Sequence, residues 1–229
     1  MEDTSIVLVL VDEQYGFGGT SNSSITNAYI YAPDGNQNAI GISGESTGTV
    51  NITSTWLGNG RTAGDDSRYV IANMGKANMT VKDSRIYAGQ YSTGGISVYE
   101  VVTINLTGDT SIWARNTTGD LNYGPRCVGA DSSLTSAEAP KVVFNSTGYF
   151  YSAGQYVGYG ATSSMKYTVT MGNFVSRETK YMFHNGSGAL TSYYSSGSTG
   201  NRSFYYMTSL NTRESVSISG CYYYSKGIS

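Results

Sequence analysis

Apolar and polar residues alternate along this chain in short segments that recur from end to end. The segments read apolar, polar, apolar, which is the two-residue period of a half-buried β-strand. They lie at Val50-Asn51-Ile52, Met79-Thr80-Val81, Ile104-Asn105-Leu106, Val142-Val143-Phe144, Tyr167-Thr168-Val169 and Val216-Ser217-Ile218, where Val143 is the exception. No window shows a 3.6-residue period, so the pattern predicts strands and essentially no helix.

A three-residue phrase follows most of these strands after a short turn. It consists of a large apolar residue, an aromatic or aliphatic residue, and then Ala, Gly or Ser. It occurs at Ile30-Tyr31-Ala32, Trp56-Leu57-Gly58, Ile86-Tyr87-Ala88, Ile112-Trp113-Ala114, Phe150-Tyr151-Ser152, Phe174-Val175-Ser176, Tyr193-Tyr194-Ser195 and Tyr223-Tyr224-Ser225. A Gly- and Ser-rich loop and a third short apolar strand come next, at 39–42, 69–72, 95–98, 127–130, 156–159, 181–183 and 204–207.

The phrases recur at spacings that cluster near roughly 26 residues, inside the range typical of solenoid repeats. Three strands per repeat is the plan of a parallel β-helix. The sequence therefore predicts an all-β fold, a single right-handed parallel β-helix of about eight coils. We expect the β-helix over residues 24–229, preceded by residues 1–23 as an N-terminal cap or assembly segment.

The segments NAIGISGESTGTVNITSTWL and NMTVKDSRIYAGQYSTGGISVYEVVTINLTGDTSIWA carry a resemblance to a known fold. They resemble the right-handed parallel β-helix repeats of the pectin-lyase-like superfold. More narrowly, they resemble the Gly/Ser/Thr-rich repeats of secreted adhesins and autotransporter passenger domains. The resemblance covers roughly residues 24–225. It implies the architecture and says little of function, because this superfold carries lyases, hydrolases, adhesins and viral spikes.

Neighbouring residues of a strand point to opposite faces, so each phrase divides into inner and outer positions. The large first residue and the small third residue should point inward. The middle residue should point outward, which gives the column Tyr31, Leu57, Tyr87, Trp113, Tyr151, Val175, Tyr194 and Tyr224. Its aromatic members are the candidate binding residues, for sugar rings or for a partner protein. The alternative is that Tyr simply favours a half-buried strand surface.

The amino-acid composition limits the classes of protein to which this chain can belong. Only 13% of the 229 residues are charged and the net charge is −2 without a basic block, which argues against a nucleic-acid partner. No apolar segment reaches the ~20 residues of a membrane span. The candidate N-glycosylation sequons are at Asn22, Asn51, Asn78, Asn105, Asn116, Asn145, Asn185 and Asn201. Chance would give roughly four. The excess predicts an extracellular or cell-surface protein, although a Ser/Thr/Asn-rich bacterial or viral β-structure would share it.

A few other residues suggest chemistry. Asp83 and Asp109 follow the same strand in adjacent coils, so stacking would place their carboxylates about 5 Å apart, as in a retaining glycosidase or a Ca²⁺ site. Asp is also an ordinary turn residue. Asp65, Asp66 and Arg85 are the charges that could join this pair.

The remaining reactive side chains suggest no cofactor. His184 is the only histidine, with no acid or nucleophile placed beside it. Cys127 and Cys221 lie several coils apart, which predicts two buried thiols rather than a disulfide. No Cys/His cluster suggests zinc, so we expect no metal and no cofactor.

The two ends of the chain suggest self-association. The run Ile6, Val7, Leu8, Val9, Leu10 and Val11 is apolar on both faces, so it should cap the first coil or add to the edge of a neighbouring chain. The C-terminal coil, with Val216, Ile218 and Tyr222–Tyr224, keeps the repeat pattern without a polar cap.

These features together favour a non-enzymatic extracellular structural or adhesive module. It could be a filament or fibre subunit that associates end to end and presents its aromatic column, with copies of itself or surface glycans as partners. The alternative is a polysaccharide-active enzyme, a lyase, glycosidase or phage-type depolymerase, that uses Asp83 and Asp109.

Overall fold

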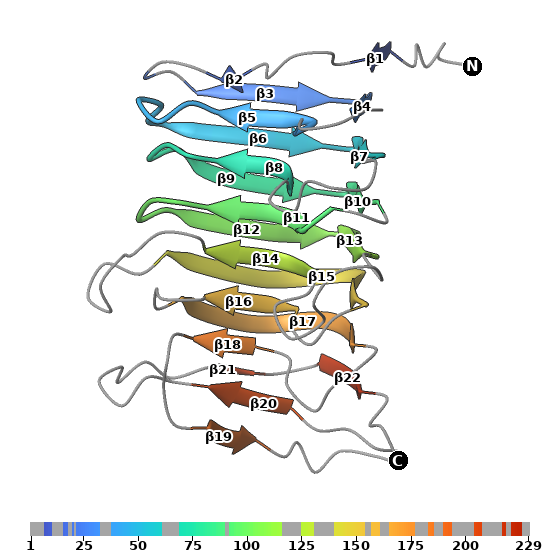
Figure 1. Ribbon diagram of the computed structural model, residues 1–229, viewed down its shortest axis with the longest axis vertical. Coiled ribbons are helices and arrows are strands. Elements are labelled where there is room, and N and C mark those ends of the chain that lie inside the picture. The colour runs from blue at the N-terminus through green and yellow to red at the C-terminus, as the bar shows by residue number, and fades with distance from the viewer. Residues whose placement is uncertain are drawn as a thin grey trace.

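The computed structural model describes residues 7–10, 16–17, 20, 22–32, 38–60, 69–89, 92–115, 125–130, 140–153, 157–160, 165–176, 183–185, 190–193, 204–207, 217–218 and 221–225. Within these residues all regular structure is β-strand and no segment is helical. The strands wind into a parallel β-solenoid (Figure 1). The predictions of an all-β chain and of a parallel solenoid are therefore confirmed.

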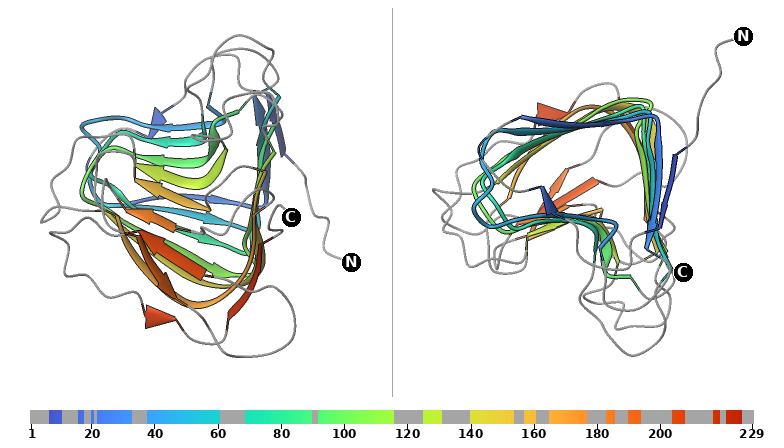
Figure 2. Two further views of the ribbon diagram at one scale, coloured as in Figure 1. Left: turned by 60° about the horizontal axis from the view of Figure 1, so that its bottom comes forward. Right: turned by 90° about the horizontal axis from the view of Figure 1, so that it is seen from above.

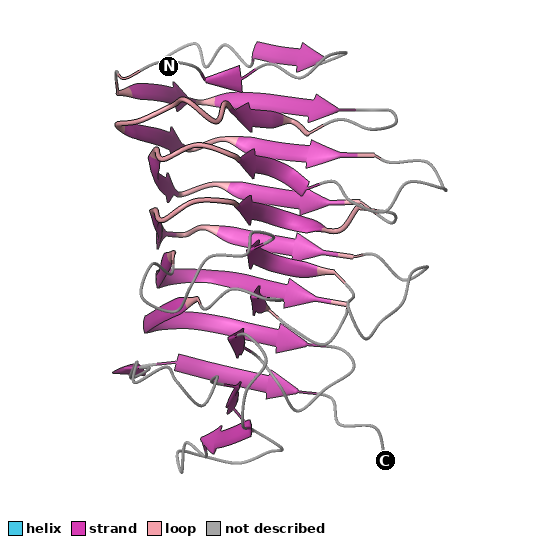
Figure 3. Ribbon diagram, turned by 60° about the vertical axis from the view of Figure 1, so that its left-hand side comes forward, coloured by secondary structure: helices cyan, strands magenta, loops and turns pink. Residues whose placement is uncertain are grey.

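Four complete coils of three strands each run from β3 to β14. Their strands are β3 (Ser23–Thr26), β4 (Ala28–Ala32), β5 (Ile40–Ile42), β6 (Thr49–Thr53), β7 (Trp56–Asn59), β8 (Tyr69–Asn73), β9 (Asn78–Lys82), β10 (Arg85–Ala88), β11 (Gly94–Val98), β12 (Thr103–Gly108), β13 (Ser111–Ala114) and β14 (Arg126–Ala130). Corresponding strands of successive coils run in the same direction (Figure 3).

The stack continues below β14 with a different division into strands. The first and second strands fuse in β15 (Lys141–Ser152) and again in β17 (Lys166–Ser176), each followed by a short third strand, β16 (Gly158–Gly160) and β18 (Phe183–Asn185). The described strands do not confirm the predicted count of eight coils.

The described strands belong to two sheets. First and second strands form a 13-stranded sheet, because β15 and β17 pair with both sets, and third strands form a 9-stranded sheet. Seen from above, the coils enclose a three-sided interior (Figure 2). Apolar side chains in register fill this interior, as Ile52, Val81 and Leu106 show, each with no exposed surface.

The ends of the stack depart from the repeat. At the N-terminal end β1 (Val7–Leu10) pairs with β4 of the same chain, and β2 (Gly16–Phe17) pairs with β5. The described part of the apolar N-terminal run therefore covers the chain's own first coil. Ile6 and Val11 lie outside the described residues.

At the C-terminal end, one predicted coil is wrong. Tyr193 closes β19 (Leu190–Tyr193), which pairs antiparallel with β20 (Phe204–Met207) in the 9-stranded sheet instead of adding a phrase to the aromatic column. The next phrase instead pairs directly with β17, through β22 (Cys221–Ser225), beside β21 (Ser217–Ile218). The antiparallel direction of β19 breaks the parallel pattern that the phrase implied.

The phrase of the second coil is displaced by one residue from its expected register. Leu57, expected outside, aligns with Ile30 and Ile86 and is fully buried. Trp56, expected inside, aligns with Tyr29 and Arg85 and is only partly buried on the outer face. Leu matches the volume of the Ile residues above and below it in the core, so the larger Trp lies outside.

Cys127 confirms the expectation of a buried thiol. Its side chain is free and has no exposed surface, and burial raises the pKa of the thiol well above its usual value. Cys221 lies in β22 of the other sheet, and its side chain is outside the description.

A tight corner joins the first and second strands of each complete coil. One residue of the corner adopts a left-handed backbone, at Asn27, Ser54, Asp83 and Gly108, with φ between 50° and 62°. Asn, Asp and Gly are the residues that accept this conformation most readily. The corner changes the direction of the chain, and the second strand begins directly after it. The outer faces of the first and the second strands therefore lie on different sides of the solenoid.

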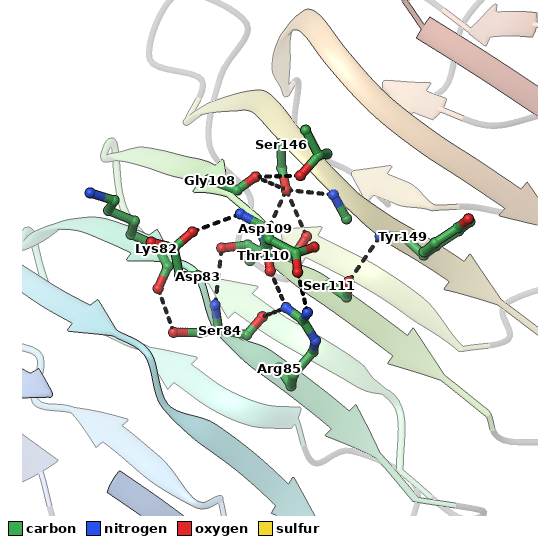
Figure 4. Close-up of polar contacts among 12 residues, drawn as sticks. Lys82, Asp83, Ser84, Arg85, Gly108, Asp109, Thr110, Ser111, Ser146 and Tyr149 are labelled. Atoms are coloured by element: carbon green, nitrogen blue, oxygen red, sulfur yellow. Dashed lines mark hydrogen bonds and ion pairs between the residues drawn. The ribbon is translucent and has the colours of Figure 1, made fainter. Parts of the chain in front are cut away.

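Buried hydroxyl groups of Thr55, Ser84, Thr110 and Ser146 link the corners of successive coils. The backbone N–H of Thr55 donates to Ser84 Oγ (3.1 Å), and that of Ser84 donates to Thr110 Oγ1 (3.4 Å). The N–H of Thr110 donates in turn to Ser146 Oγ (2.9 Å; Figure 4). Each hydroxyl also donates to a carbonyl of a corner. This hydroxyl ladder leaves the buried donors at this edge paired, as burial requires.

Candidate binding surface on the outer face of the second strands

The outer face of β4, β7, β10, β13 and β15 carries two columns of side chains. Strand register makes one column of Tyr31, Gly58, Tyr87, Trp113 and Tyr151, and the other of Tyr29, Trp56, Arg85, Ser111 and Tyr149. The inner residues between these columns, such as Ile86 and Ile112, are fully buried, whereas the four large rings of the first column are only partly buried. The predicted alternation therefore holds in the phrases that begin at Ile30, Ile86, Ile112 and Phe150.

Trp56 lies in a stack of rings on this face. Its ring centroid is 4.3 Å from that of Tyr29, with the planes 4° apart, and 6.2 Å from that of Tyr87, with the planes 21° apart. Tyr31 leans against it at 6.0 Å and 45°. Tyr29 belongs to the coil on one side of Trp56 and Tyr87 to the coil on the other. Both faces of the indole are therefore turned toward other rings.

Gly58 makes room for this stack. A Cβ atom at Gly58 would lie 2.4 Å from Cη2 of Trp56, so the indole lies across the position where a side chain of the first column would stand. The one-residue displacement of the second coil and the glycine together let Trp56 reach both neighbouring coils. We call Tyr29, Tyr31, Trp56 and Tyr87, together with Arg115, whose guanidinium lies over the Tyr87 ring, the stacked group.

Arg115 closes the stacked group on the far side of Tyr87. Its guanidinium carbon lies 5.4 Å from the Tyr87 ring centroid, and Nη1 donates to the Tyr87 hydroxyl. The arginine follows β13, whereas Trp56 lies on β7, and these two strands flank β10. Tyr87 thus has the indole toward one neighbouring coil and a cation toward the other, an arrangement that the negative ring face favours.

Three other rings on this face, which we call the open group, are Trp113, Tyr149 and Tyr151. None of the ring-to-ring contacts in the described part of the chain involves them, although Trp113 and Tyr151 are in register on neighbouring strands. Tyr149 is 55% exposed, the largest value among the described large apolar residues. In Figure 4 its ring points away from the corner. The open group therefore has ring surface that no other ring in the described part of the chain contacts.

The candidate binding residues are placed unequally. Tyr31, Tyr87, Trp113 and Tyr151 share one outer face, as expected. Tyr224, on β22, is in register with Val175 of β17, and the Tyr224 side chain is outside the description. Tyr194 lies beyond the described residues.

Sequence reasoning missed Tyr29, Trp56 and Tyr149 as outer residues. Tyr29 and Tyr149 precede recognised members by two residues, so the strand period could have found them. Trp56 could have been found by aligning Thr55 with the corner hydroxyls of the next coils, instead of aligning the phrases.

Asp83 and Asp109 are offset by one position. The pairing of Lys82 with Thr107 places Asp83 beside Gly108, and Asp109 is the next residue. The Asp83 carboxylate accepts the backbone N–H of Asp109 (2.8 Å), and a Cβ at Gly108 would lie 2.1 Å from that carboxylate oxygen. The glycine thus accommodates the side chain of Asp83.

Asp109 forms an ion pair with Arg85, whose guanidinium also donates to the backbone carbonyl of Asp109 (Figure 4). Both carboxylates are exposed, and each is engaged by a group of the corner itself. Two charge-assisted bonds therefore join the same two adjacent coils, one from the Asp109 N–H to Asp83 and one from Arg85 to Asp109. Together they hold the corner. Asp65 and Asp66 lie outside the described residues.

The described residues contain no group of three or more His, Cys, Asp and Glu side chains that could hold a metal ion. His184 lies in β18, in register with Tyr159 and Met207, and its side chain is outside the description.

Five of the candidate sequons lie along the first strands, on a different outer face from the rings. Asn22, Asn78 and Asn145 are exposed, and Asn51 and Asn105 are partly buried. Two of these side chains serve the fold, since the Oδ1 atoms of Asn22 and Asn78 accept the backbone N–H of the next coil at 3.0 and 2.8 Å. Asn185 lies in β18, and Asn116 and Asn201 are outside the described residues.

Comparisons with known proteins leave the family of this chain open. No protein-family model matches it, and neither the curated proteins nor the solved structures contain a match. Within the described residues, no helix has the length and apolar character needed to cross a membrane.

Proposed function

We propose that this chain is a non-enzymatic extracellular structural or adhesive module, a right-handed β-helix that presents an aromatic outer face to surface glycans. The observation that carries the proposal is the row of partly exposed Tyr and Trp rings, in register, on one face of a regular solenoid. Aromatic rings offer a large rigid contact area, and the Tyr hydroxyl adds a hydrogen-bonding group. The resemblance of the repeat sequences to pectin-lyase-like β-helices and to secreted adhesins supports the same assignment.

Binding of the purified protein to a glycan panel tests the proposal. The informative variant carries Tyr87→Ser, Trp113→Ser and Tyr151→Ser together. Because these side chains point outward, we expect the variant to keep its β-rich circular dichroism spectrum and to lose glycan binding. A variant that unfolds would show that the rings belong to the core. A folded variant with unchanged binding would remove this face from the function.

The extracellular location is supported by the exposed sequons at Asn22, Asn78 and Asn145. We expect the protein to acquire glycans when it is expressed in a secretory eukaryotic cell. Mass spectrometry of its peptides before and after enzymatic deglycosylation measures the occupancy of each site. Unmodified peptides at all three positions would withdraw this support.

The polysaccharide-cleaving alternative draws no specific support from the described residues, because the carboxylates of Asp83 and Asp109 hold the corner. An enzyme would release reducing or unsaturated ends from a polysaccharide, and Asp83→Asn would abolish the release. Product formation above background, lost in that variant, would replace the adhesive assignment by this one.

End-to-end association into a filament stays a prediction. β1 already pairs with the chain's own β4, and the antiparallel β19 ends the other sheet, where a continuing stack would need a parallel strand. Electron microscopy and sedimentation of the native protein distinguish filaments from single particles. If filaments form through the N-terminal run, deletion of residues 1–12 should shorten them without loss of β-structure.

A further inference from the structure

We infer that the open group, Trp113, Tyr149 and Tyr151, is the part of the outer face that accepts sugar rings, and that its ligand is an uncharged, extended glycan. This inference rests on the proposed function and narrows it. The stacked group, by contrast, stabilises the solenoid. Tyr149, which the phrase pattern did not select, becomes a binding residue.

The first argument is the availability of ring faces. A pyranose ring binds an aromatic side chain by laying its C–H bonds against the ring face, so a face covered by another ring cannot serve. Trp56 has Tyr29 at 4.3 Å on one side and Tyr87 at 6.2 Å on the other. Trp113 and Tyr151 contact no ring of the described residues, although their strands are neighbours. Among the described rings of this face, those of the open group are therefore the ones that no other described ring contacts.

The second argument is the support beneath Tyr149. Its N–H donates to the buried Ser111 Oγ (2.9 Å), and a Cβ at Gly148 would lie only 2.0 Å from the Thr110 carbonyl. Gly148 N–H also donates to Ser146 Oγ (3.0 Å), the last hydroxyl of the ladder. The backbone that carries Tyr149 is therefore fixed on both sides by the corner, while the ring itself is 55% exposed. Because this backbone is already held in place, little backbone conformational entropy is lost when the ring binds a ligand.

The third argument is the geometry of the three positions. Trp113 and Tyr151 are in register on strands about 4.8 Å apart, and Tyr149 precedes Tyr151 by two residues, about 6.6 Å along the strand. The backbone positions of the three residues therefore lie close together on two neighbouring strands. Such a patch can contact consecutive sugars of an extended chain, whereas a single ring could contact one.

The fourth argument concerns charge. The positions in register with Tyr149 are Ser111 and Asn173, and those in register with Tyr151 are Trp113 and Val175, so none is ionisable. The arginines of this face are engaged elsewhere, Arg85 with Asp109 and Arg115 with Tyr87. Arg115, two residues after Trp113, is the described cation nearest to this patch, and its guanidinium lies over Tyr87 and donates to that hydroxyl. Among the described residues no cation is in register with Tyr149 or Tyr151, which favours a neutral polysaccharide over an acidic one at these two rings.

Intrinsic fluorescence tests the assignment directly, because the chain has only two tryptophans, one in each group. The probes are soluble β-glucan and chitin oligosaccharides, with polygalacturonate as the acidic comparison. In a Trp56→Phe variant we expect the neutral ligand to change the remaining emission. In a Trp113→Phe variant we expect no response from Trp56 at the same ligand concentrations.

Affinity measurements complete the test. The double variant Tyr149→Ala/Tyr151→Ala should bind the neutral oligosaccharide at least tenfold more weakly, with an unchanged urea midpoint. Trp56→Leu is the matched control, which should unfold at lower urea yet bind within twofold of wild type. Unchanged binding by the double variant, or a preference for polygalacturonate, would overturn this inference while the proposed function stood. A wild-type protein that binds no glycan would overturn both.

Discussion

The stacked group and the open group occupy the same outer face, follow the same alternation and cover the same kind of core, yet their rings lie in different surroundings. Trp56 is enclosed by Tyr29 and Tyr87, with Arg115 beyond Tyr87. Trp113 has aromatic neighbours in register on both sides, Tyr87 and Tyr151, yet it contacts no ring of the described residues. Membership of an aromatic column is therefore not sufficient for stacking.

The difference comes from single positions rather than from the repeat. The stacked group exists because Gly58 leaves a gap and the one-residue displacement of its coil puts Trp56 outside. In the column of Tyr149 the neighbouring positions are Ser111 and Asn173, which have no ring to offer. A solenoid repeats its backbone closely enough to form columns, but the residue at each position decides whether the column is covered or available.

The largest effect should come from the core that the two groups share. Ile86 lies beneath the stacked group and Ile112 beneath the open group, and both are fully buried. We expect Ile86→Asp and Ile112→Asp each to prevent folding, because each would place a charge among apolar side chains. Soluble yield and circular dichroism measure the outcome. Native spectra for either variant would mean that these positions are not core.

The two tryptophans should separate the groups by stability. Trp56→Leu removes three ring contacts and should lower the free energy of unfolding by about 2 kcal/mol, whereas Trp113→Leu should lower it by less than about 1 kcal/mol. Urea denaturation followed by circular dichroism measures both values. Equal losses would erase the distinction between the stacked group and the open group.

Substitution of Gly58 should disturb the stack without removing a ring. Gly58→Ala places a methyl group 2.4 Å from the indole of Trp56, and we expect a loss of about 1 kcal/mol as the ring moves off its neighbours. Gly44→Ala is the matched control, since its Cβ would meet nothing nearer than 3.7 Å. A stability change no larger than that of the control would show that the indole does not depend on this gap.

The smallest effect should be at the end of the stacked group. Arg115→Gln removes the cation over Tyr87 and should cost about 0.5–1 kcal/mol, the range of an exposed cation–π contact. Arg115→Lys should recover part of the loss, because it restores the charge. Thermal unfolding at low and high salt provides the measurement. No loss in Arg115→Gln would leave Tyr87 held by Trp56 alone.

The strand pattern predicted much of the architecture because its causes are local. Alternation and turn residues within a few positions placed the first, second and third strands, and the parity of Ile86, Tyr87 and Ala88 follows from the geometry of any extended chain. The same parity brought Tyr31, Tyr87, Trp113 and Tyr151 onto one face. These statements need no knowledge of what lies in the next coil.

The errors arose where contacts between coils outweigh local similarity. The phrase at Trp56 looks like its relatives, but the core accepts Leu57 beside Ile30 and Ile86 and leaves Trp56 outside. Asp83 and Asp109 look equivalent, but the extra residue in the later corner shifts Asp109 by one position. Tyr193 looks like a phrase, yet it lies in an antiparallel strand of the other sheet. Each is a question of register, which strand propensity does not fix.

The sequence by itself determined that this chain forms strands, that it turns at regular intervals and that its aromatic residues alternate with core residues, because these follow from side-chain period and turn chemistry. Only the tertiary structure decided which rings cover one another, which carboxylates hold a corner and which tyrosine is left exposed. The physical reason is that stacking and corner hydrogen bonds join residues about 26 positions apart in the chain but one strand spacing apart in space. Local pattern gives the face on which a side chain lies, and its neighbours in the adjacent coils decide what it can contact.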